Sequence, residues 1–338
     1  MATLAANNPT LLDVSKVTDP DGGIADVVEI LNETNEVLDD MVWMEGNLVT
    51  GHQTSVRTGL PTPTWRKMYG GVDPTKSTTV QVTDSCGMME AYAEIDKRVA
   101  DLNGNTSAFR MSEERPHIEG MSQEMVDTLF YGNEATEPEA FTGFAPRYND
   151  LSAANADNII DAGGTGTDNA SIWLVVWDEN KCFGVFPKGS NSGLQVNDKG
   201  QVTIEDASNG SNTGRMEGYR THYAWDAGLV LKDWRYVVRI CNIDKSLLSL
   251  VYTAGAFATG AHLPNLMFQA MRLPPNLNGR AAFYMSRDLE TSLMQQTAAA
   301  VQGSTLTTEN VGGKVVTSFH KIPIRRCDAL SADEARVT

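Results

Sequence analysis

The chain of 338 residues carries 27 basic and 43 acidic side chains, which gives a formal net charge of −16 and a pI near 4.7. This balance argues against a DNA-binding module, because affinity for phosphates is carried by clustered Lys and Arg. No run of residues approaches the roughly 18 consecutive apolar side chains of a membrane span, and the N-terminus lacks the basic and apolar regions of a signal peptide.

Residues 1–45 predict an N-terminal arm. The first 20 residues are small and polar and contain Asn-Asn-Pro and Asp-Pro breakers, so they favour an extended segment without a core of its own. Residues 24–44 place apolar side chains at mostly helical spacing with Asp and Glu between them, which predicts a short helix with an acidic outer face.

Residues 46–87 predict a long β-hairpin with too little apolar content to stand alone. Two polar limbs, 52–58 and 77–83, are joined through a Pro- and Gly-rich segment. A two-stranded hairpin is marginal in water, so it needs support from outside. A disordered surface loop and an intersubunit arm are the alternatives, and we favour the arm because exposed aromatic side chains are costly to leave in solvent. The candidate intersubunit contacts are Arg57, Trp65, Arg66, Lys67 and Tyr69.

A short helix is predicted over 88–101, and a long amphipathic helix follows it. At about 100° per residue, five apolar side chains of the long helix fall within an arc of roughly 140°, which predicts one buried face. With Ser112 as its cap and Gly132-Asn133 as a left-handed stop, the helix spans about 19 residues. A start at Thr106 would instead place Pro116 inside a longer, kinked helix. The buried-face residues are Ile118, Met121, Met125, Val126 and Leu129.

From residue 171 the pattern changes to short strands separated by turns. Apolar and aromatic runs predict strands at 171–177, 181–187, 201–206, 218–231 and 234–244, with a turn at 197–200 and a loop at 205–218. Tryptophans that alternate with aliphatic residues on strands are typical of core anchors. These are Trp173, Trp177, Trp225 and Trp234.

The last hundred residues return to helices and end in strands. Helical segments are predicted at 247–252, 265–271 and 288–301, with a strand at 280–286 before the last of them. Residues 305–313 predict a polar turn and 314–330 predict strands.

Two motifs resemble a known family. The helix end LFYGN at 129–133, its acidic spacer and the segment FTGFAPRY at 141–148 resemble the spine helix and exit segment of tailed-bacteriophage major capsid proteins. KVVTSFHKIPIRRCDAL at 314–330 resembles the closing strands of the same proteins, nearest those of epsilon-fifteen-type short-tailed phages. The resemblance implies an α+β, Hong Kong 97-like capsid fold with an N-terminal arm, an extended β-hairpin loop, a spine-helix peripheral domain and an axial domain.

The length exceeds the size at which one core usually stops growing, so two domains are expected. The resemblance implies an arm at 1–45, the extended loop at 46–87, a peripheral domain at 88–160 and 305–338, and an axial domain at 161–304.

The resemblance also implies self-assembly. Hexamers and pentamers would build the icosahedral shell of a phage of the class Caudoviricetes around double-stranded DNA, which an acidic wall would contact only non-specifically. Portal, scaffolding and cement or decoration proteins are the further partners implied, and no membrane is. The protein is expected in the virion after synthesis in the bacterial cytoplasm.

No catalytic, cofactor or metal site is predicted, so we do not expect an enzyme. The five histidines show no HExxH spacing, and no GxSxG elbow occurs. Four cysteines make no CxxC pair or disulfide framework, which favours buried reduced thiols. The alternative function is a soluble enzyme or binding protein with a β-rich domain whose site has no recognisable motif.

Overall fold

The structure is a computed structural model, and its described residues fall into two compact units. The first unit is built from residues 88–125 and 193–226, and the second from residues 35–87, 126–192 and 227–338. The described residues are 33, 35–102, 106–206, 214–248, 252–253, 256–257, 260–299, 306–311, 314–330 and 333–338.

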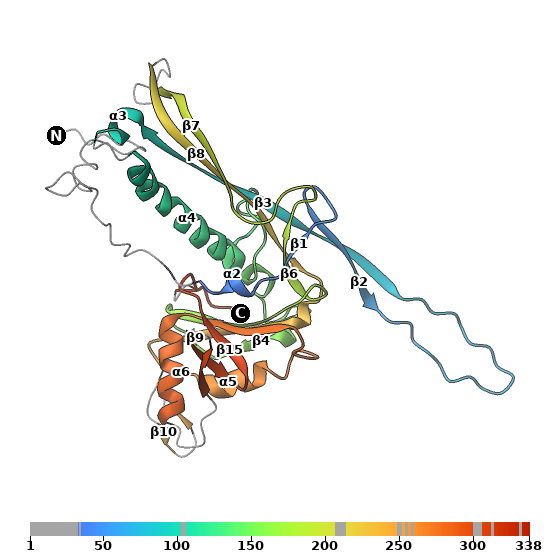
Figure 1. Cartoon of the computed structure of the whole chain (residues 1–338). Helices are drawn as coiled ribbons and strands as arrows, with labels where there is room; N and C mark the ends of the chain where they lie inside the picture. Colours follow the sequence, from blue (N-terminus) through green and yellow to red (C-terminus); the bar gives the residue numbers. More distant parts are fainter. Residues whose placement is uncertain are drawn as a thin grey trace. The chain divides into compact units, whose positions relative to one another are not determined.

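The first unit packs a helix against long strands (Figure 1). Its small core contains Ile95, Ala100 and Phe109. Arg110 on the helix forms an ion pair with Asp198 on a strand at 2.8 Å, which holds the two elements together. Elements with residues in this unit are β3 (Thr78–Asp96), α3 (Lys97–Ala100), α4 (Thr106–Tyr131), β7 (Gln195–Asp206) and β8 (Gly214–Leu231).

The second unit is organised around β5 (Asn169–Trp177), which is buried along its whole length. The antiparallel strands β9 (Val237–Asp244) and β12 (Arg280–Met285) flank β5 on its two edges. The sheet continues from β12 through β15, β14 and β13. Further strands of this unit are β1 (Trp43–Glu45), β2 (Gly51–Gly59), β4 (Ile159–Asp161), β6 (Cys182–Phe186), β10 (Tyr252–Thr253), β11 (Ala256–Phe257), β13 (Leu306–Val311), β14 (Lys314–Phe319) and β15 (Ile322–Arg326).

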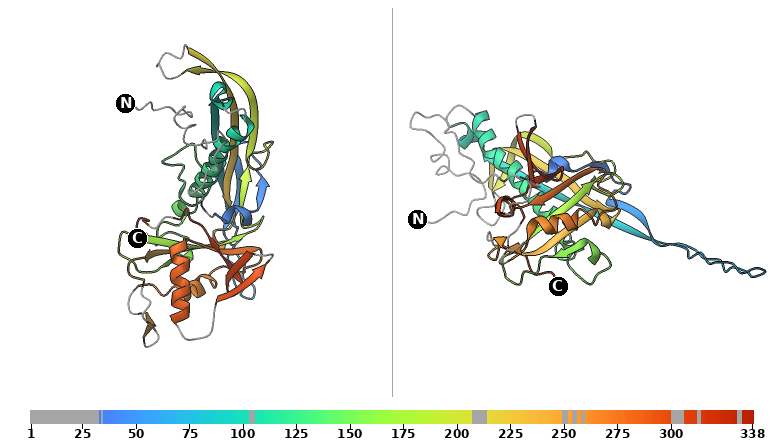
Figure 2. Two further views of the ribbon diagram at one scale, coloured as in Figure 1. Left: turned by 60° about the vertical axis from the view of Figure 1, so that its left-hand side comes forward. Right: turned by 90° about the horizontal axis from the view of Figure 1, so that it is seen from below.

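Both faces of the sheet are covered at β5, which explains the unbroken apolar run over residues 172–177. The helices α5 (Leu263–Ala270) and α6 (Arg287–Ala299) lie on one side of it (Figures 1 and 2) and pack against its aliphatic residues. On the other side, Trp173 is surrounded by aromatic rings of Phe130, Phe144 and Tyr148, with ring centroids 5.7–6.1 Å away. The short helices of this unit are α2 (Val37–Asp40), η1 (Ala145–Arg147), η2 (Ala156–Asn158) and η3 (Trp234–Tyr236).

A buried ion pair fixes the C-terminal residues to the second unit. The Arg239 guanidinium donates to the Glu334 carboxylate at 2.8 Å, and both side chains are almost fully buried. Ser171 and Tyr131 also donate hydroxyl hydrogen bonds to Glu334. The carboxylate is therefore well satisfied, as a charge in a protein interior must be.

Several predicted elements are confirmed. The hairpin limbs appear in β2 and β3, and the strands predicted at 171–177 and 280–286 appear as β5 and β12. The helices at 265–271 and 288–301 appear as α5 and α6, and the closing strands as β14 and β15.

The long helix begins earlier than the cap signal predicted. It starts at Thr106, so Pro116 lies inside it and Ser112 is not its cap. The predicted face is buried from Met121 onward, but Ile118 is 40% exposed. The left-handed stop is also wrong, since Gly132 does not have positive φ. A Cβ at Gly132 would lie 2.5 Å from the carbonyl oxygen of Thr128, so close packing requires the glycine.

Other local predictions are wrong. Residues 88–96 continue strand β3, where a helix was expected, and 43–45 form β1. The expected turn at 197–200 lies inside β7 as a register irregularity in its pairing with β8. Residues 306–311 form β13 and are not a turn, because β14 pairs with them. Trp234 is 36% exposed and is no core anchor.

Some predictions fall outside the described residues. These are the arm over 1–32, the tip of the loop at 207–213 and residues 249–251 of the helix predicted at 247–252.

Candidate functional site

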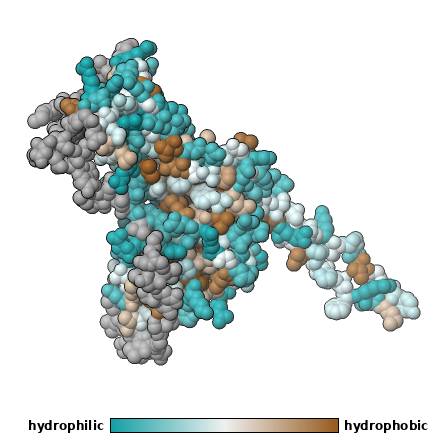
Figure 3. Space-filling model, viewed as in Figure 1, coloured by the Kyte–Doolittle hydropathy of each residue, from teal (hydrophilic) through white to brown (hydrophobic). Residues whose placement is uncertain are grey.

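The loop between β2 and β3 is the segment on which the candidate contact residues lie. The two strands pair antiparallel from Gly51 opposite Ser85 to Gly59 opposite Thr78. Residues 60–77 then continue beyond the paired strands and extend away from the other elements of the second unit (Figures 1 and 3). We call residues 60–77 the hairpin loop.

A tight turn shapes the far part of the hairpin loop. The Gly70 N–H donates to the Lys67 carbonyl at 3.0 Å, and the Arg66 Nε donates to the Gly70 carbonyl at 2.7 Å. Tyr69 adopts a left-handed conformation with φ of 63°. The turn leaves Trp65 and Tyr69 fully in solvent, at 102% and 97% exposed.

The hairpin loop combines exposed apolar side chains with unpaired cations. Three basic residues outnumber the single acidic residue, Asp73, in a chain that is otherwise strongly acidic. Among the described residues, no carboxylate forms an ion pair with these cations. The exposed apolar side chains are Leu60, Trp65, Met68, Tyr69 and Val72. Exposed apolar surface of this kind marks interaction sites.

The structure brings together four of the five predicted contact residues. Trp65, Arg66, Lys67 and Tyr69 lie in or beside the turn of the hairpin loop, whereas Arg57 lies on β2 opposite Thr79. All five are exposed.

An ion pair that the sequence did not indicate fixes the base of the hairpin. Arg147 donates to Asp84 on β3 at 2.8 Å, and the Asp84 side chain is only 4% exposed. The same guanidinium donates to the carbonyls of Thr142 and Gly143 in the exit segment and of Leu229 on β8. Arg147 belongs to the FTGFAPRY motif, and this motif was the only feature of the sequence that pointed to Arg147.

A half-buried histidine lies beside this ion pair. His52 is opposite Asp84 in the strand pair, and its ring packs edge-on against Phe183 at 5.5 Å. Burial lowers the pKa of His52 below its usual 6.5, Lys232 lowers it further, and Asp84 opposes the shift. The lowered pKa favours the neutral form of the imidazole at the base of the hairpin.

The described residues contain no group of three or more His, Cys, Asp or Glu side chains placed to bind a metal ion. No helix in the described part of the chain has the length and hydropathy needed to cross a bilayer. All four cysteines lie in the described part of the chain and none forms a disulfide; three are buried and Cys86 is half-buried.

Comparison with known proteins gives the family. The family model for the major capsid protein GP7 matches residues 19–338. A capsid structure of bacteriophage Epsilon15 is similar with a TM-score of 0.80 and 34% identity over 100% of both chains. The chain belongs to the GP7 family of major capsid proteins.

Other solved capsids are more distant. The capsid of bacteriophage JBD30 is 10% identical with a TM-score of 0.46, covering 89% of this chain and 93% of that one. A capsid of a native GTA particle is 9% identical with a TM-score of 0.44, covering 70% and 99%. No curated protein matches the sequence.

The match confirms the predictions of a tailed-phage major capsid protein and of a Hong Kong 97-like α+β fold. The protein is a structural component of a phage capsid, and phage capsid proteins are part of the virion. The alternative of an unrelated soluble enzyme or binding protein is thereby set aside.

Proposed function

We propose that this capsid protein assembles its shell by placing the hairpin loop on a neighbouring copy of the same chain. The observation that carries the proposal is the fully exposed Trp65 and Tyr69 beside unpaired Arg66 and Lys67, on a hairpin whose base is fixed. Large aromatic and Arg side chains are the residues that most often anchor interfaces.

The energetics favour association over a free loop. Full burial of an aromatic side chain contributes about 1.5–3 kcal/mol. The cations of the hairpin loop would meet a copy of a chain whose net charge is −16, so complementary fields favour the encounter. Repetition of a modest contact in a closed symmetric particle makes the whole assembly stable.

The same proposal includes features that belong to the assembled particle. We propose hexamers and pentamers in an icosahedral shell around double-stranded DNA, with portal, scaffolding and decoration proteins as partners and synthesis in the bacterial cytoplasm. We also retain the division into arm 1–45, extended loop 46–87, peripheral domain 88–160 with 305–338, and axial domain 161–304. Membership of a major capsid protein family supports the shell among these features.

The test is assembly of purified protein, followed by gel filtration and negative-stain microscopy. Wild type should form shells of megadalton size. The variant Trp65→Ala, Arg66→Glu should remain soluble and folded by circular dichroism but form no shells, because it loses the aromatic anchor and presents a carboxylate to an acidic neighbour.

Lys199→Glu is the matched control, because Lys199 is an exposed cation on β7 and lies outside the hairpin loop. It should assemble like wild type. Normal shell yield and salt dependence of the Trp65 and Arg66 variant would exclude the hairpin loop from the interface. Unfolding of that variant would place Trp65 in the subunit's own core and also contradict the proposal.

A further inference from the structure

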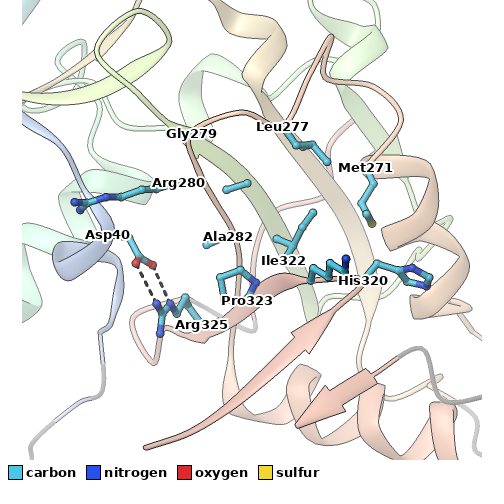
Figure 4. A pocket seen from close by; sticks show the side chains of 12 residues that line it. Asp40, Met271, Leu277, Gly279, Arg280, Ala282, His320, Ile322, Pro323 and Arg325 are labelled. Atoms are coloured by element: carbon cyan, nitrogen blue, oxygen red, sulfur yellow. Dashed lines mark hydrogen bonds and ion pairs between the residues drawn. The ribbon is translucent and has the colours of Figure 1, made fainter. Parts of the chain in front are cut away.

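A pocket in the second unit lies outside the hairpin loop and combines an apolar floor with a basic rim. Its volume is about 500 Å³. Strand β12 and the turn between β14 and β15 form two of its walls (Figure 4). The apolar lining residues are Met271, Leu277, Ala281, Ala282, Ile322 and Pro323.

The rim carries uncompensated positive charge. Asp40 is already engaged, because Arg325 donates to both of its carboxylate oxygens at 3.0 and 3.2 Å (dashed lines in Figure 4). Arg280 and Lys321 are exposed lining residues, and neither forms an ion pair with any described residue. The pocket therefore presents two available cations in a chain whose net charge is −16.

The turn that carries Lys321 has a backbone conformation that its two central residues, His320 and Lys321, rarely adopt. Phe319 and Ile322 pair across a two-residue connection, and His320 and Lys321 both have positive φ, at 48° and 70°. Such turns favour Asn-Gly. Strained backbone of this kind is concentrated at functional sites, which supports a binding role for the rim.

The chemistry of the pocket limits its occupant. The hairpin loop is excluded because its own net charge is positive. An inorganic anion would use the cations and leave the apolar floor uncovered. An acidic peptide that also carries small apolar side chains would satisfy both parts of the pocket.

The chain itself contains such a segment after α4. The exposed residues 134–139, Glu-Ala-Thr-Glu-Pro-Glu, hold three carboxylates together with Ala135 and Pro138. Hydrogen bonds to Asn133 preform this turn, because the N–H groups of Ala135 and Glu137 donate to its side chain and carbonyl at 3.0 and 2.9 Å. A preformed turn loses little conformational entropy on binding. We call residues 134–139 the acidic turn.

We propose that the pocket lined by Arg280 and Lys321 receives the acidic turn of a second copy of this chain. This inference rests on the proposed assembly and adds a second contact, with its own donor and acceptor segments. Glu137 and Glu139 would face the two cations, and Pro138 would cover the apolar floor.

Charge reversal on each side tests the pairing. Arg280→Glu, Lys321→Glu should reduce shell yield at least tenfold, and Glu137→Lys, Glu139→Lys should do the same. The protein that carries all four changes should recover assembly, because both signs are exchanged together. Arg272→Glu, another exposed cation of the second unit, is the control and should assemble normally.

The outcomes separate this inference from the proposed function. Wild type that never forms shells would defeat the proposed function. If wild type and the Arg280→Glu, Lys321→Glu variant form shells with the same yield, only the pocket inference is overturned. Loss of assembly in both reversals without recovery in the fourfold variant would also overturn it. Binding of a DNA oligonucleotide that disappears in the Arg280 and Lys321 variant, with assembly unchanged, would assign the pocket to phosphate instead.

Discussion

The ion pair between Arg147 and Asp84 should be the most sensitive residue contact at the base of the hairpin. Removal of one partner leaves the other buried without compensation, which typically costs about 3–5 kcal/mol. Arg147→Ala should therefore lower the free energy of unfolding by about that amount in urea denaturation of unassembled protein.

Arg235→Ala is the control for this measurement. Arg235 forms an ion pair with Asp233 but is 54% exposed, so its loss should change stability by no more than about 1 kcal/mol. Equal effects of the two variants would mean that the pair at the hairpin base is not buried in solution.

His52 should make stability depend on pH. Its pKa is lowered in the folded protein, mainly by burial, so the unfolded chain binds the proton more readily. The stabilisation from neutral His52 is complete above about pH 6.5 and is lost as the pH falls from there toward the lowered pKa. The melting temperature of wild type should fall more steeply between pH 7 and 5 than that of His52→Gln. Parallel curves would contradict this role.

At the scale of elements, a single charged substitution tests which face of α4 is buried. Met125 is 1% exposed, and a carboxylate buried there without a partner costs several kcal/mol, comparable with the stability of a domain. Met125→Asp should give insoluble protein on expression. Glu124→Lys on the exposed side should stay soluble and folded, and a soluble Met125→Asp variant with unchanged thermal stability would show that the face is wrongly assigned.

Elements could be predicted where their own pattern decides their structure. The run of apolar residues in β5 and the helical spacing in α5 and α6 suffice, because burial against neighbours only reinforces them. The strand at 88–96 was missed because MMEAYAEID has good helix formers, and pairing within a long sheet overrides that propensity. The start of α4 at Thr106 was only the alternative prediction, because Ser112 could cap a helix and Pro116 would then lie in its first turn.

The candidate site likewise contains residues that the sequence could predict and a contact that it could not. Exposed aromatic and basic residues in a Pro- and Gly-rich loop are visible in the sequence, so Trp65 and its neighbours could be named. The pairing of Asp84 with Arg147 joins residues 63 positions apart, and no local pattern reports it.

At the scale of the whole molecule, assembly should protect the hairpin loop. In a free subunit this loop has few hydrogen bonds and exposed side chains, which makes it a target for proteases. Limited proteolysis should cleave residues 60–77 rapidly in free subunits and slowly in shells, as followed by mass spectrometry. Equal cleavage rates in both states would remove the loop from the assembly mechanism.

The buried pair between Arg239 and Glu334 also imposes an order in time. Its partners are 95 positions apart, and at about 5–20 residues per second a ribosome needs roughly 5–20 s to travel from one to the other. During that interval Arg239 on β9 lacks the Glu334 carboxylate with which it forms its ion pair. A nascent chain therefore cannot complete the packing of its second unit until Glu334 has left the ribosome.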